Sequence, residues 1–158
     1  MHKRVNKKKT WLKRIVATVL VIIVLLAGVY WYVSTETFSD TKSRSADYSL
    51  NALDFIHEFQ QNINAANEKY TDKIIVLNGR VSEIEPADTS VNIKIIEPAT
   101  ASYVIFSFQQ QHLGEAKIVK QGDSISIKGS CSGGIYSSIL EATAINFKRS
   151  TLNKQISN

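Results

Sequence analysis

One uncharged stretch constrains this chain more than any other part of its sequence. Residues 15–33 read IVATVLVIIVLLAGVYWYV and contain neither a charged residue nor a proline. At about 1.5 Å per residue these 19 residues make a helix roughly 28 Å long, which matches a hydrocarbon core about 30 Å thick. We therefore predict a single transmembrane helix over residues 15–33.

The flanks of this stretch predict its orientation. Residues 1–14 hold seven Lys or Arg residues and no acid, so the positive-inside rule places this basic tail in the cytoplasm. Trp11 on one side and Tyr30, Trp31 and Tyr32 on the other are typical of the aromatic belts at the two membrane interfaces. We expect a cytoplasmic (inner) membrane protein with its N-terminus in the cytoplasm and its C-terminal domain on the periplasmic, extracytoplasmic side.

A cleaved secretory signal is the alternative reading of the same segment. The basic start suits a signal, but the apolar run is longer than a usual signal core, and the bulky residues 30–33 leave no small-x-small cleavage site just past it. Residues 26–29 have the outline of a lipoprotein signal but lack its cysteine. The domain that follows lies outside the cytoplasm under either reading.

Charge is divided unevenly along the chain. The pI of 9.3 reflects the basic tail, because residues 15–158 carry twelve cations against fourteen acids. A nucleic-acid-binding domain is expected to carry a basic surface of its own. The division therefore counts against nucleic acid as the partner.

One helix and several strands are predicted in the soluble part. The polar residues 34–44 read as a linker. Ser45 is a plausible N-cap, with Asp47 in the first turn. Apolar residues then recur at spacings of three and four and predict a helix that packs on its own domain: Leu50, Leu53, Ile56, Phe59, Ile63, Ala66 and Tyr70.

From residue 71 the pattern changes to strands. We expect them at 73–85 with a bend at Gly79, and at 90–97, 101–109, 124–131 and 138–147, with a hairpin bend at 132–134 and a frayed tail from residue 148. Five uneven strands fit a mainly β, closed Greek-key barrel of the OB type, with the preceding helix capping one end. An immunoglobulin-like sandwich needs about seven. The predicted organisation is a basic cytoplasmic tail (1–14), a transmembrane helix (15–33), a linker (34–44), an OB-fold domain (45–148) and a tail (149–158).

Three runs of residues resemble a known family. They are 64–70 (NAANEKY), 73–81 (KIIVLNGRV) and 120–133 (KQGDSISIKGSCSG), the last of which follows the pattern K-G-D-x-V-x-V-K-G-x-C-S-G. Over about residues 46 to 147 the chain resembles the tRNA_anti-like OB-fold family of small bacterial envelope proteins. The resemblance implies an OB barrel with an N-terminal helix. Gln121 stands where lysine is common, and an apolar helix replaces the lipoprotein cysteine.

A second resemblance concerns the architecture alone. The haem chaperone of cytochrome c maturation also combines a basic start, one N-terminal anchor and an extracytoplasmic OB barrel. Its function requires a histidine just past the barrel, and residues 146–158 contain none. The three histidines are His2 in the basic tail, His57 on the predicted helix and His112 in the connection between strands. A haem-chaperone-like role therefore stays an alternative, and we expect no cofactor.

The sequence offers little support for catalysis. No Ser/His/Asp arrangement or metal-ligand spacing is present. His112 near Glu115 is expected to be a solvated surface histidine, and Glu83 with Glu85 an inert pair on a strand edge. Cys131 is the sole cysteine and is expected to be buried at a strand end as a small apolar residue. We predict that the chain is not an enzyme and holds no metal.

A binding or assembly module remains as the predicted function. OB barrels commonly bind ligands across strands two and three, where this sequence places Lys94, Tyr103, Ile105 and Ser107. An ordinary half-apolar sheet surface accounts for the same four residues equally well. We predict a non-catalytic module that binds a protein partner or a small envelope ligand, with haem-chaperone-like or nucleic-acid binding as the alternative.

Overall fold

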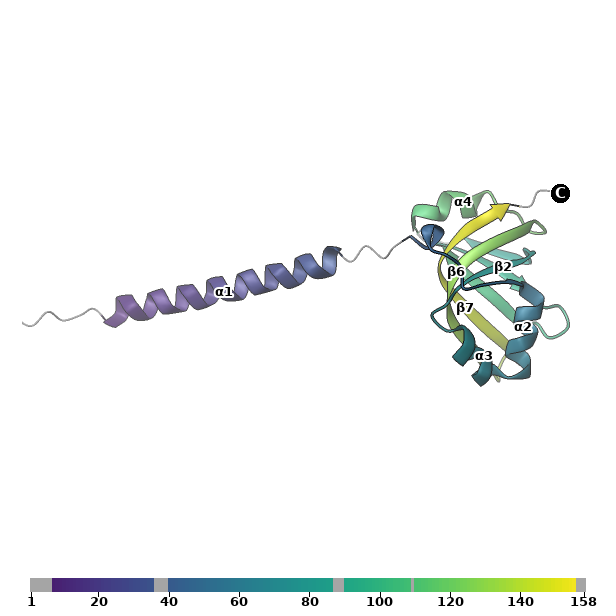
Figure 1. The fold of residues 1–158 in the computed structure, drawn as a ribbon, viewed down its shortest axis with the longest axis horizontal. Helices are drawn as coiled ribbons and strands as arrows, with labels where there is room; N and C mark the ends of the chain where they lie inside the picture. The colour runs from purple at the N-terminus through teal and green to yellow at the C-terminus, as the bar shows by residue number, and fades with distance from the viewer. Residues whose placement is uncertain (1–6, 36–39, 87–89, 109, 156–158) are drawn as a thin grey trace, which may run out of the picture. The chain divides into compact units, whose positions relative to one another are not determined.

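The computed structural model describes residues 7–35, 40–86, 90–108 and 110–155. The chain forms two compact units, Met1–Phe38 and Ser39–Asn158, which are described separately (Figure 1). The first unit consists of α1, Lys7–Thr35. Within it, Lys13–Trp31 is apolar and long enough to cross a membrane, and none of this window is buried. The helix therefore includes the predicted residues 15–33 and extends beyond both ends.

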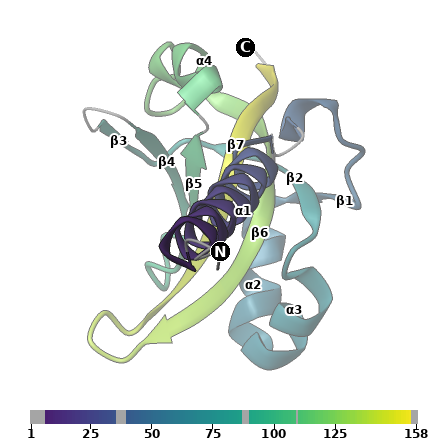
Figure 2. The same ribbon diagram turned by 90° about the vertical axis from the view of Figure 1, so that its left-hand side faces the viewer.

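The second unit is one mixed β-sheet with short helices (Figure 2). Its strand order is β1-β2-β6-β7-β5-β4-β3. The pairs β1/β2 and β5/β7 are parallel, and the others are antiparallel. The strands are β1 (Tyr48–Asn51), β2 (Ile74–Arg80), β3 (Glu83–Pro86), β4 (Val91–Ile96), β5 (Tyr103–Phe108), β6 (Ser124–Ser137) and β7 (Ala142–Gln155).

The prediction of five strands is wrong for the described residues, where there are seven. β1 was not expected, and the strand predicted at 73–85 divides after Arg80. β2 pairs with β6, whereas β3 pairs with β4. The break falls at Val81 and Ser82, whose amides donate to Asp123 O (2.9 Å) and Lys94 O (2.9 Å) on two different neighbours. We call the segment from Gly79 to Ser82 the β2–β3 junction.

The prediction of a single helix after Ser45 is also wrong. β1 comes first, followed by α2 (Ala52–Gln61) and α3 (Ile63–Tyr70). Side chains explain the boundaries, because Asn51 Oδ1 accepts from the amide of Leu53 (2.8 Å) and Asn62 Oδ1 from that of Ala65 (3.0 Å). Asp47 does not begin a helix, because its carboxylate accepts from the Ile74 amide at the start of β2 (2.8 Å).

The last hairpin is longer than predicted at both ends. β6 continues past the expected bend at 132–134 to Ser137, and β7 continues past residue 147 to Gln155. Gly133 has φ +93° and lies where the β6–β7 register shifts, so the glycines bulge the strand instead of reversing it. At Gly134 a Cβ would lie 2.6 Å from Phe59 Cδ1. Ser150, Thr151 and Leu152 are buried, which excludes a frayed tail over this part.

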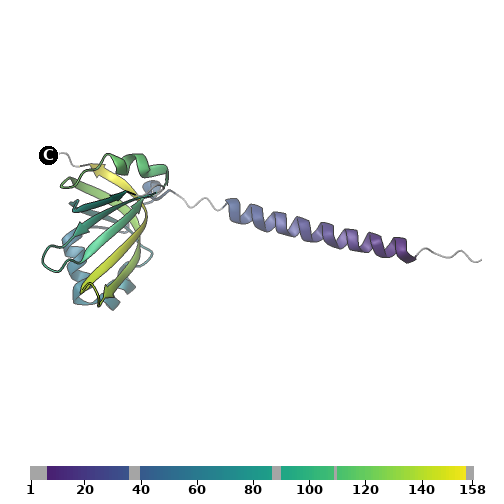
Figure 3. The ribbon, with the colours of Figure 1, turned by 180° about the vertical axis from the view of Figure 1, so that it is seen from behind.

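The core lies between the sheet and the two helices that cover part of it, α2 and α3 (Figure 3). Its centre is aromatic. Phe55 has ring centroids 4.9 Å from Tyr70, 5.0 Å from Phe59 and 5.8 Å from Phe147. Phe106 packs 5.0 Å from Phe147. Of the apolar stripe predicted from the sequence, Ile56, Phe59, Ala66 and Tyr70 are buried on α2 and α3, whereas Leu53 is exposed, and the buried Phe55 was not part of the predicted stripe.

Candidate functional site

The four predicted ligand-binding residues share one side of β4 and β5. Lys94 pairs with Ile105, Ile96 with Tyr103, and Asn92 with Ser107. The burial pattern alternates along both strands, and these residues occupy the less buried positions, with Ser107 exposed and Lys94, Tyr103 and Ile105 half-buried. We call this surface the β4–β5 face.

The cation of the β4–β5 face is already neutralised. Lys94 Nζ hydrogen-bonds Glu85 and lies 3.5 Å from a Glu83 carboxylate oxygen. It also lies 5.4 Å from the centroid of the Tyr103 ring. The hydrogen bond to Glu85 raises the pKa of Lys94, so the lysine stays charged and paired. The Ser107 hydroxyl donates to Asn92 Oδ1 (3.0 Å). One cation beside two carboxylates does not attract a phosphate.

The residues of the family motif make contacts that stabilise the fold. Asn67 of α3 grips the β6 bulge, accepting from the Gly134 amide (2.7 Å) and donating to its carbonyl (3.0 Å). Cys131 is buried, as predicted, and exchanges backbone hydrogen bonds with Asp72 (2.8 Å) and Lys73 (3.0 Å). Burial raises the pKa of the Cys131 thiol to about 11, so the thiol is neutral and unreactive at neutral pH.

The K-x-G-D part of the motif is structural as well. Gly122 has φ +89°, a conformation that glycine adopts without strain, and its amide donates to Val81 O (2.8 Å). Asp123 accepts from the Lys120 amide (2.9 Å) and closes this turn. Lys128 Nζ donates to the carbonyls of Lys42 and Arg44 (3.2 and 3.0 Å). The hydrogen bonds of these motif residues therefore stabilise the fold.

His112 is a correction to the sequence analysis. The histidine belongs to η2 (Gln110–His112), just before α4 (Leu113–Lys117), and it is 7% exposed instead of solvated. Its Nε2 lies 2.8 Å from Asp40 Oδ1 and its Nδ1 3.5 Å from Glu115 Oε1.

The same contacts correct the prediction that residues 34–44 form a linker. Asp40 caps the short helix η1 (Thr41–Ser43) by accepting from the Lys42 amide (2.9 Å), so the end of the predicted linker packs on the domain. Lys42 Nζ bonds Glu115, and the Thr151 hydroxyl donates to Glu115 Oε2 (3.2 Å). We call Asp40, Lys42, His112, Glu115 and Thr151 the clamp.

The clamp is a set of paired charges without a metal-ligand arrangement. The hydrogen bond from His112 lowers the pKa of Asp40. Burial opposes ionisation of Glu115, but the hydrogen bond and charge of Lys42 outweigh it and lower the pKa of Glu115. Among the described residues, no group of three or more His, Cys, Asp or Glu is placed to hold a metal ion. His57, on α2, is exposed.

The tip of the β6–β7 hairpin was missed by the sequence analysis. Four large apolar side chains there are exposed: Ile135 (68%), Tyr136 (57%), Ile139 (92%) and Leu140 (62%). We call them the hairpin tip. The run from 135 to 140, IYSSIL, carries the signal that could have revealed them, because apolar residues flank a Ser-Ser turn on both sides.

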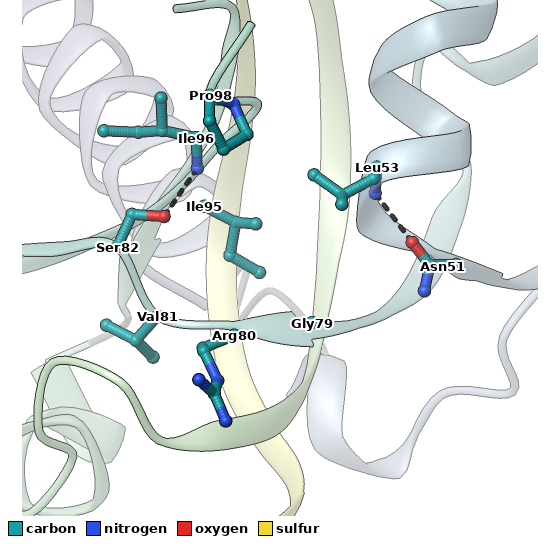
Figure 4. Close-up of a pocket in the computed structure, with 9 residues that line it drawn as sticks. All are labelled: Asn51, Leu53, Gly79, Arg80, Val81, Ser82, Ile95, Ile96 and Pro98. Atoms are coloured by element: carbon teal, nitrogen blue, oxygen red, sulfur yellow. Dashed lines mark hydrogen bonds between the residues drawn. The ribbon is translucent and has the colours of Figure 1, made fainter.

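A cleft lies beside the β2–β3 junction (Figure 4). Its volume is about 290 Å³. Nine residues line it, from the start of α2, from the junction and from the end of β4: Asn51, Leu53, Gly79, Arg80, Val81, Ser82, Ile95, Ile96 and Pro98. None of the four predicted ligand-binding residues is among them, although Ile96 lies on the same side of β4 as Lys94.

The chain is similar to a number of solved structures, two of which have informative names. One is a lipoprotein of Klebsiella pneumoniae whose name provisionally assigns it nucleic-acid binding. It is 14% identical, with a TM-score of 0.53 over 66% of this chain and 91% of that one. The other is a protein of Leishmania major named provisionally as an aspartyl-tRNA synthetase, 7% identical with a TM-score of 0.44 over 77% of this chain and 22% of that one. Among curated proteins, none matches.

The likeness to the Klebsiella lipoprotein shows a shared fold and, at 14% identity, nothing more. Family membership is shown separately, by the sequence. The family profile described as tRNA_anti-like matches residues 2–142, which is most of the chain. This agrees with the resemblance carried by the three sequence runs and with their structural roles at the Asn67–Gly134 contact and the Gly122 turn. The chain belongs to the tRNA_anti-like family.

Proposed function

We propose that this chain is a non-catalytic binding module of the bacterial envelope. An N-terminal transmembrane helix holds its OB barrel outside the cytoplasm, and the barrel docks a protein partner. The observation that carries the proposal is the hairpin tip, where four large apolar side chains are each more than half exposed. Contiguous exposed apolar surface on a small domain is typical of an interaction site.

Helix α1 supports the anchor. From Ile15 to Trp31 its large apolar side chains are exposed, each by 39% or more, and water is a poor environment for such a surface. A bilayer covers it without any tertiary contact. The seven cations of residues 1–14 favour a cytoplasmic N-terminus, which puts the domain on the extracytoplasmic side of the inner membrane.

Strand pairing supports a barrel. β2 pairs with β6 and β3 with β4, yet only Val81 and Ser82 separate β2 from β3. The chain itself connects the two ends of the sheet order β2–β6–β7–β5–β4–β3 at this point, which supports our proposal that the strands close into a barrel. In this interpretation β2 and β3 together form the first of five barrel strands, and β1 is an addition beside it.

The hairpin tip has the chemistry of a protein contact. The loop between the last two strands of an OB barrel is one of its binding loops, and here that loop carries Ile139 and Leu140. Tyr136 adds a side chain type that is frequent at the energetic centre of interfaces. The only charged residue in the stretch 135–141 is Glu141. An apolar tip beside one acid suits a protein surface and repels a phosphate backbone.

Photo-crosslinking in intact cells tests the docking. A photoreactive residue at Ser138 on the tip should give a discrete adduct of higher mass, and one at the exposed Gln121 should not. Replacing Ile139 and Leu140 together with serine should abolish the adduct while the protein level stays unchanged. Adducts from both positions, or an adduct that survives the double serine variant, would contradict the proposal.

Two measurements test the anchor and its topology. A reporter that is active only outside the cytoplasm, fused after Asn158, should be active. The mature chain should still contain Trp11 when its mass is measured. A mature chain that begins near Ser34 would mean that the segment is a cleaved signal.

Nucleic-acid binding is the competing proposal, because the Klebsiella lipoprotein is named for it. Residues 45–150 carry nine cations and twelve acids, a net charge of −3. Two of these cations are already engaged within the domain: Lys94 pairs with Glu85, and Lys128 donates to backbone carbonyls. Non-specific nucleic-acid binding has a Kd of about 10⁻⁴ to 10⁻⁶ M at physiological salt. Titration of single-stranded RNA and DNA at two salt concentrations should give weaker binding, and micromolar binding that salt weakens steeply would overturn the protein-partner proposal.

A further inference from the structure

We propose that the protein partner of the hairpin tip, whose docking is the proposed function on which this inference rests, presents a lysine or arginine side chain to Tyr136 and Glu141. The partner segment then carries one cation beside the apolar residues that cover the tip. A second cleft, which borders the tip and has a volume of about 240 Å³, is where the cation binds. We call it the tip cleft.

The tip cleft joins the end of α2, the loop between β4 and β5, and both strands of the last hairpin. Its lining is polar apart from one aromatic ring: Gln60, Thr100, Ser102, Tyr136, Glu141 and Thr143. Tyr136 belongs to the hairpin tip as well, and it pairs with Thr143 across the hairpin. A partner that packs on the tip therefore also meets the cleft.

The charge of the tip cleft is negative and unpaired. None of the described residues that line it is Lys, Arg or His, and Glu141 is its single acid. Glu141 is exposed and takes part in no salt bridge within the part of the chain that the structure describes. Glu58, Glu85 and Glu115, by contrast, each pair with a lysine. A carboxylate beside an apolar contact surface favours a partner that brings the opposite charge.

Two other places in the domain show which side chain completes a glutamate and a tyrosine. In each, the Nζ of a lysine contacts both the carboxylate and the aromatic ring: Glu58–Lys69–Tyr70 and Glu85–Lys94–Tyr103. The Nζ lies 4.6 Å from the ring centroid in the first and 5.4 Å in the second, within the range of about 6 Å for cation–π attraction. At the tip cleft the tyrosine and the glutamate are present, and the described part of the chain supplies no lysine to them.

A neighbouring amide offers the cation a further acceptor. Gln60 Nε2 donates to Thr100 Oγ1, which leaves the oxygen Oε1 of Gln60 to accept. The Thr100 hydroxyl itself donates to Glu97 Oε2 (2.6 Å) and so holds this arrangement in place. Ammonium and guanidinium groups donate and do not accept. The amide oxygen and the carboxylate of the tip cleft therefore suit a lysine or an arginine.

The test selects peptides from a random library displayed on phage, with the full-length chain in nanodiscs of zwitterionic lipid as the bait. The natural chain should enrich peptides in which Lys or Arg stands beside apolar residues, at least threefold above their frequency in the library. Glu141→Lys should abolish the enrichment of the cation. Asp54→Lys, the same reversal at an exposed acid on α2 that lines neither cleft, should keep it.

The affinity of one selected peptide then measures the contact. Glu141→Gly should weaken binding at least fivefold, and the fold should tolerate it, because Glu141 has φ +49°, a conformation that glycine adopts without strain. A peptide whose cation is replaced by Gln should bind the natural chain and Glu141→Gly equally.

The outcomes separate this inference from the docking itself. Enriched peptides without a cation, equal losses in Glu141→Lys and Asp54→Lys, or unchanged affinity in Glu141→Gly would overturn the inference and leave docking at the tip intact. If the natural chain enriched no more peptides than the variant with serine at Ile139 and Leu140, the docking proposal would fail and this inference with it.

Discussion

The two ends of the β6–β7 hairpin contrast in how their side chains are used. At one end, Thr151 of β7 and Lys128 of β6 hold the clamp and η1, and polar groups pair with one another. At the other end, the hairpin tip exposes apolar side chains, Ile139 by 92%. Figure 2 shows the two strands running the length of the domain between these ends. One end is satisfied by contacts within the chain, whereas the other leaves its apolar surface in solvent.

This contrast separates residues that look functional from residues that are available for function. His112, Glu115 and Cys131 are residue types that often take part in catalysis or metal binding. Here His112 is buried, Glu115 is ion-paired and the Cys131 thiol is neutral, so each of them serves the fold. Ile139 looks ordinary in the sequence, yet its side chain is 92% exposed and makes no buried contact. Burial and pairing, more than residue type, identify the candidate surfaces.

The largest expected effect concerns Cys131, which lies on β6 between the two ends. With its pKa at about 11 against an ordinary value of 9.0, the thiolate that reacts with maleimide is about 100-fold scarcer at pH 8 than in the unfolded chain. We expect labelling of the folded chain to be at least that much slower than in denaturant. Labelling at the unfolded rate would mean that the bulge at Gly133 opens readily and that the hairpin is not one rigid element.

Breaking the clamp should cost stability. His112→Ala removes a buried side chain and leaves the carboxylates of Asp40 and Glu115 without their shared partner. We expect the free energy of unfolding to fall by about 2 kcal/mol, measured by urea denaturation. His57→Ala, at an exposed histidine, is the matched control and should change it by less than about 0.5 kcal/mol. Equal effects of the two variants would mean that the clamp contributes nothing.

Sequence patterns predicted the fold because buried residues recur with the period of a strand or of a helix. Alternation in residues 91–96 and 103–108 and the helical stripe from Phe59 to Tyr70 are direct records of which side faces the core. The predicted ends of helices and strands were wrong where tertiary contacts determine them. Asp47 suits the first turn of a helix, but its carboxylate accepts a hydrogen bond from the Ile74 amide instead. Gly133 suggests a turn, but it bulges a strand that continues to Ser137.

The candidate site was harder to predict for a related reason. Lys94 and Tyr103 were placed on one face correctly, since strand alternation determines which side a residue occupies. The pairing of Lys94 with Glu85 depends on the register of β3 against β4, which the alternation does not specify. The cleft at Gly79 joins three elements that no local pattern brings together. The exposure of Ile139 was missed because the bend was predicted at 132–134, whereas the turn lies at residues 138–141.

Changing the hairpin tip should affect stability far less than changing the clamp. Replacing Ile139 and Leu140 with serine removes no buried contact, because both side chains are already more than 60% exposed. We expect the free energy of unfolding, measured by urea denaturation, to change by no more than about 0.5 kcal/mol. A loss as large as that of His112→Ala would show that the tip packs against the domain and is not a free docking surface.

The smallest expected effect is a pH dependence at the clamp, tested with Asp40→Asn. The pKa of Asp40 is lowered in the folded chain by its hydrogen bond with His112 and, in addition, with the Lys42 amide. Ionised Asp40 therefore stabilises the fold above its ordinary pKa near 3.8, and this stabilisation is lost as the pH falls through the lower folded value. The difference in Tm between the natural chain and Asp40→Asn should be constant from pH 7 to about 5 and should shrink as the pH falls further towards 3. Glu115, which also faces His112 and whose pKa is also lowered, is present in both proteins, as is Lys42, so their contributions largely cancel in the difference. A difference that grows on acidification would mean that Asp40 destabilises the clamp, and the contrast between the two ends of the hairpin would then rest on Glu115 and Thr151 instead.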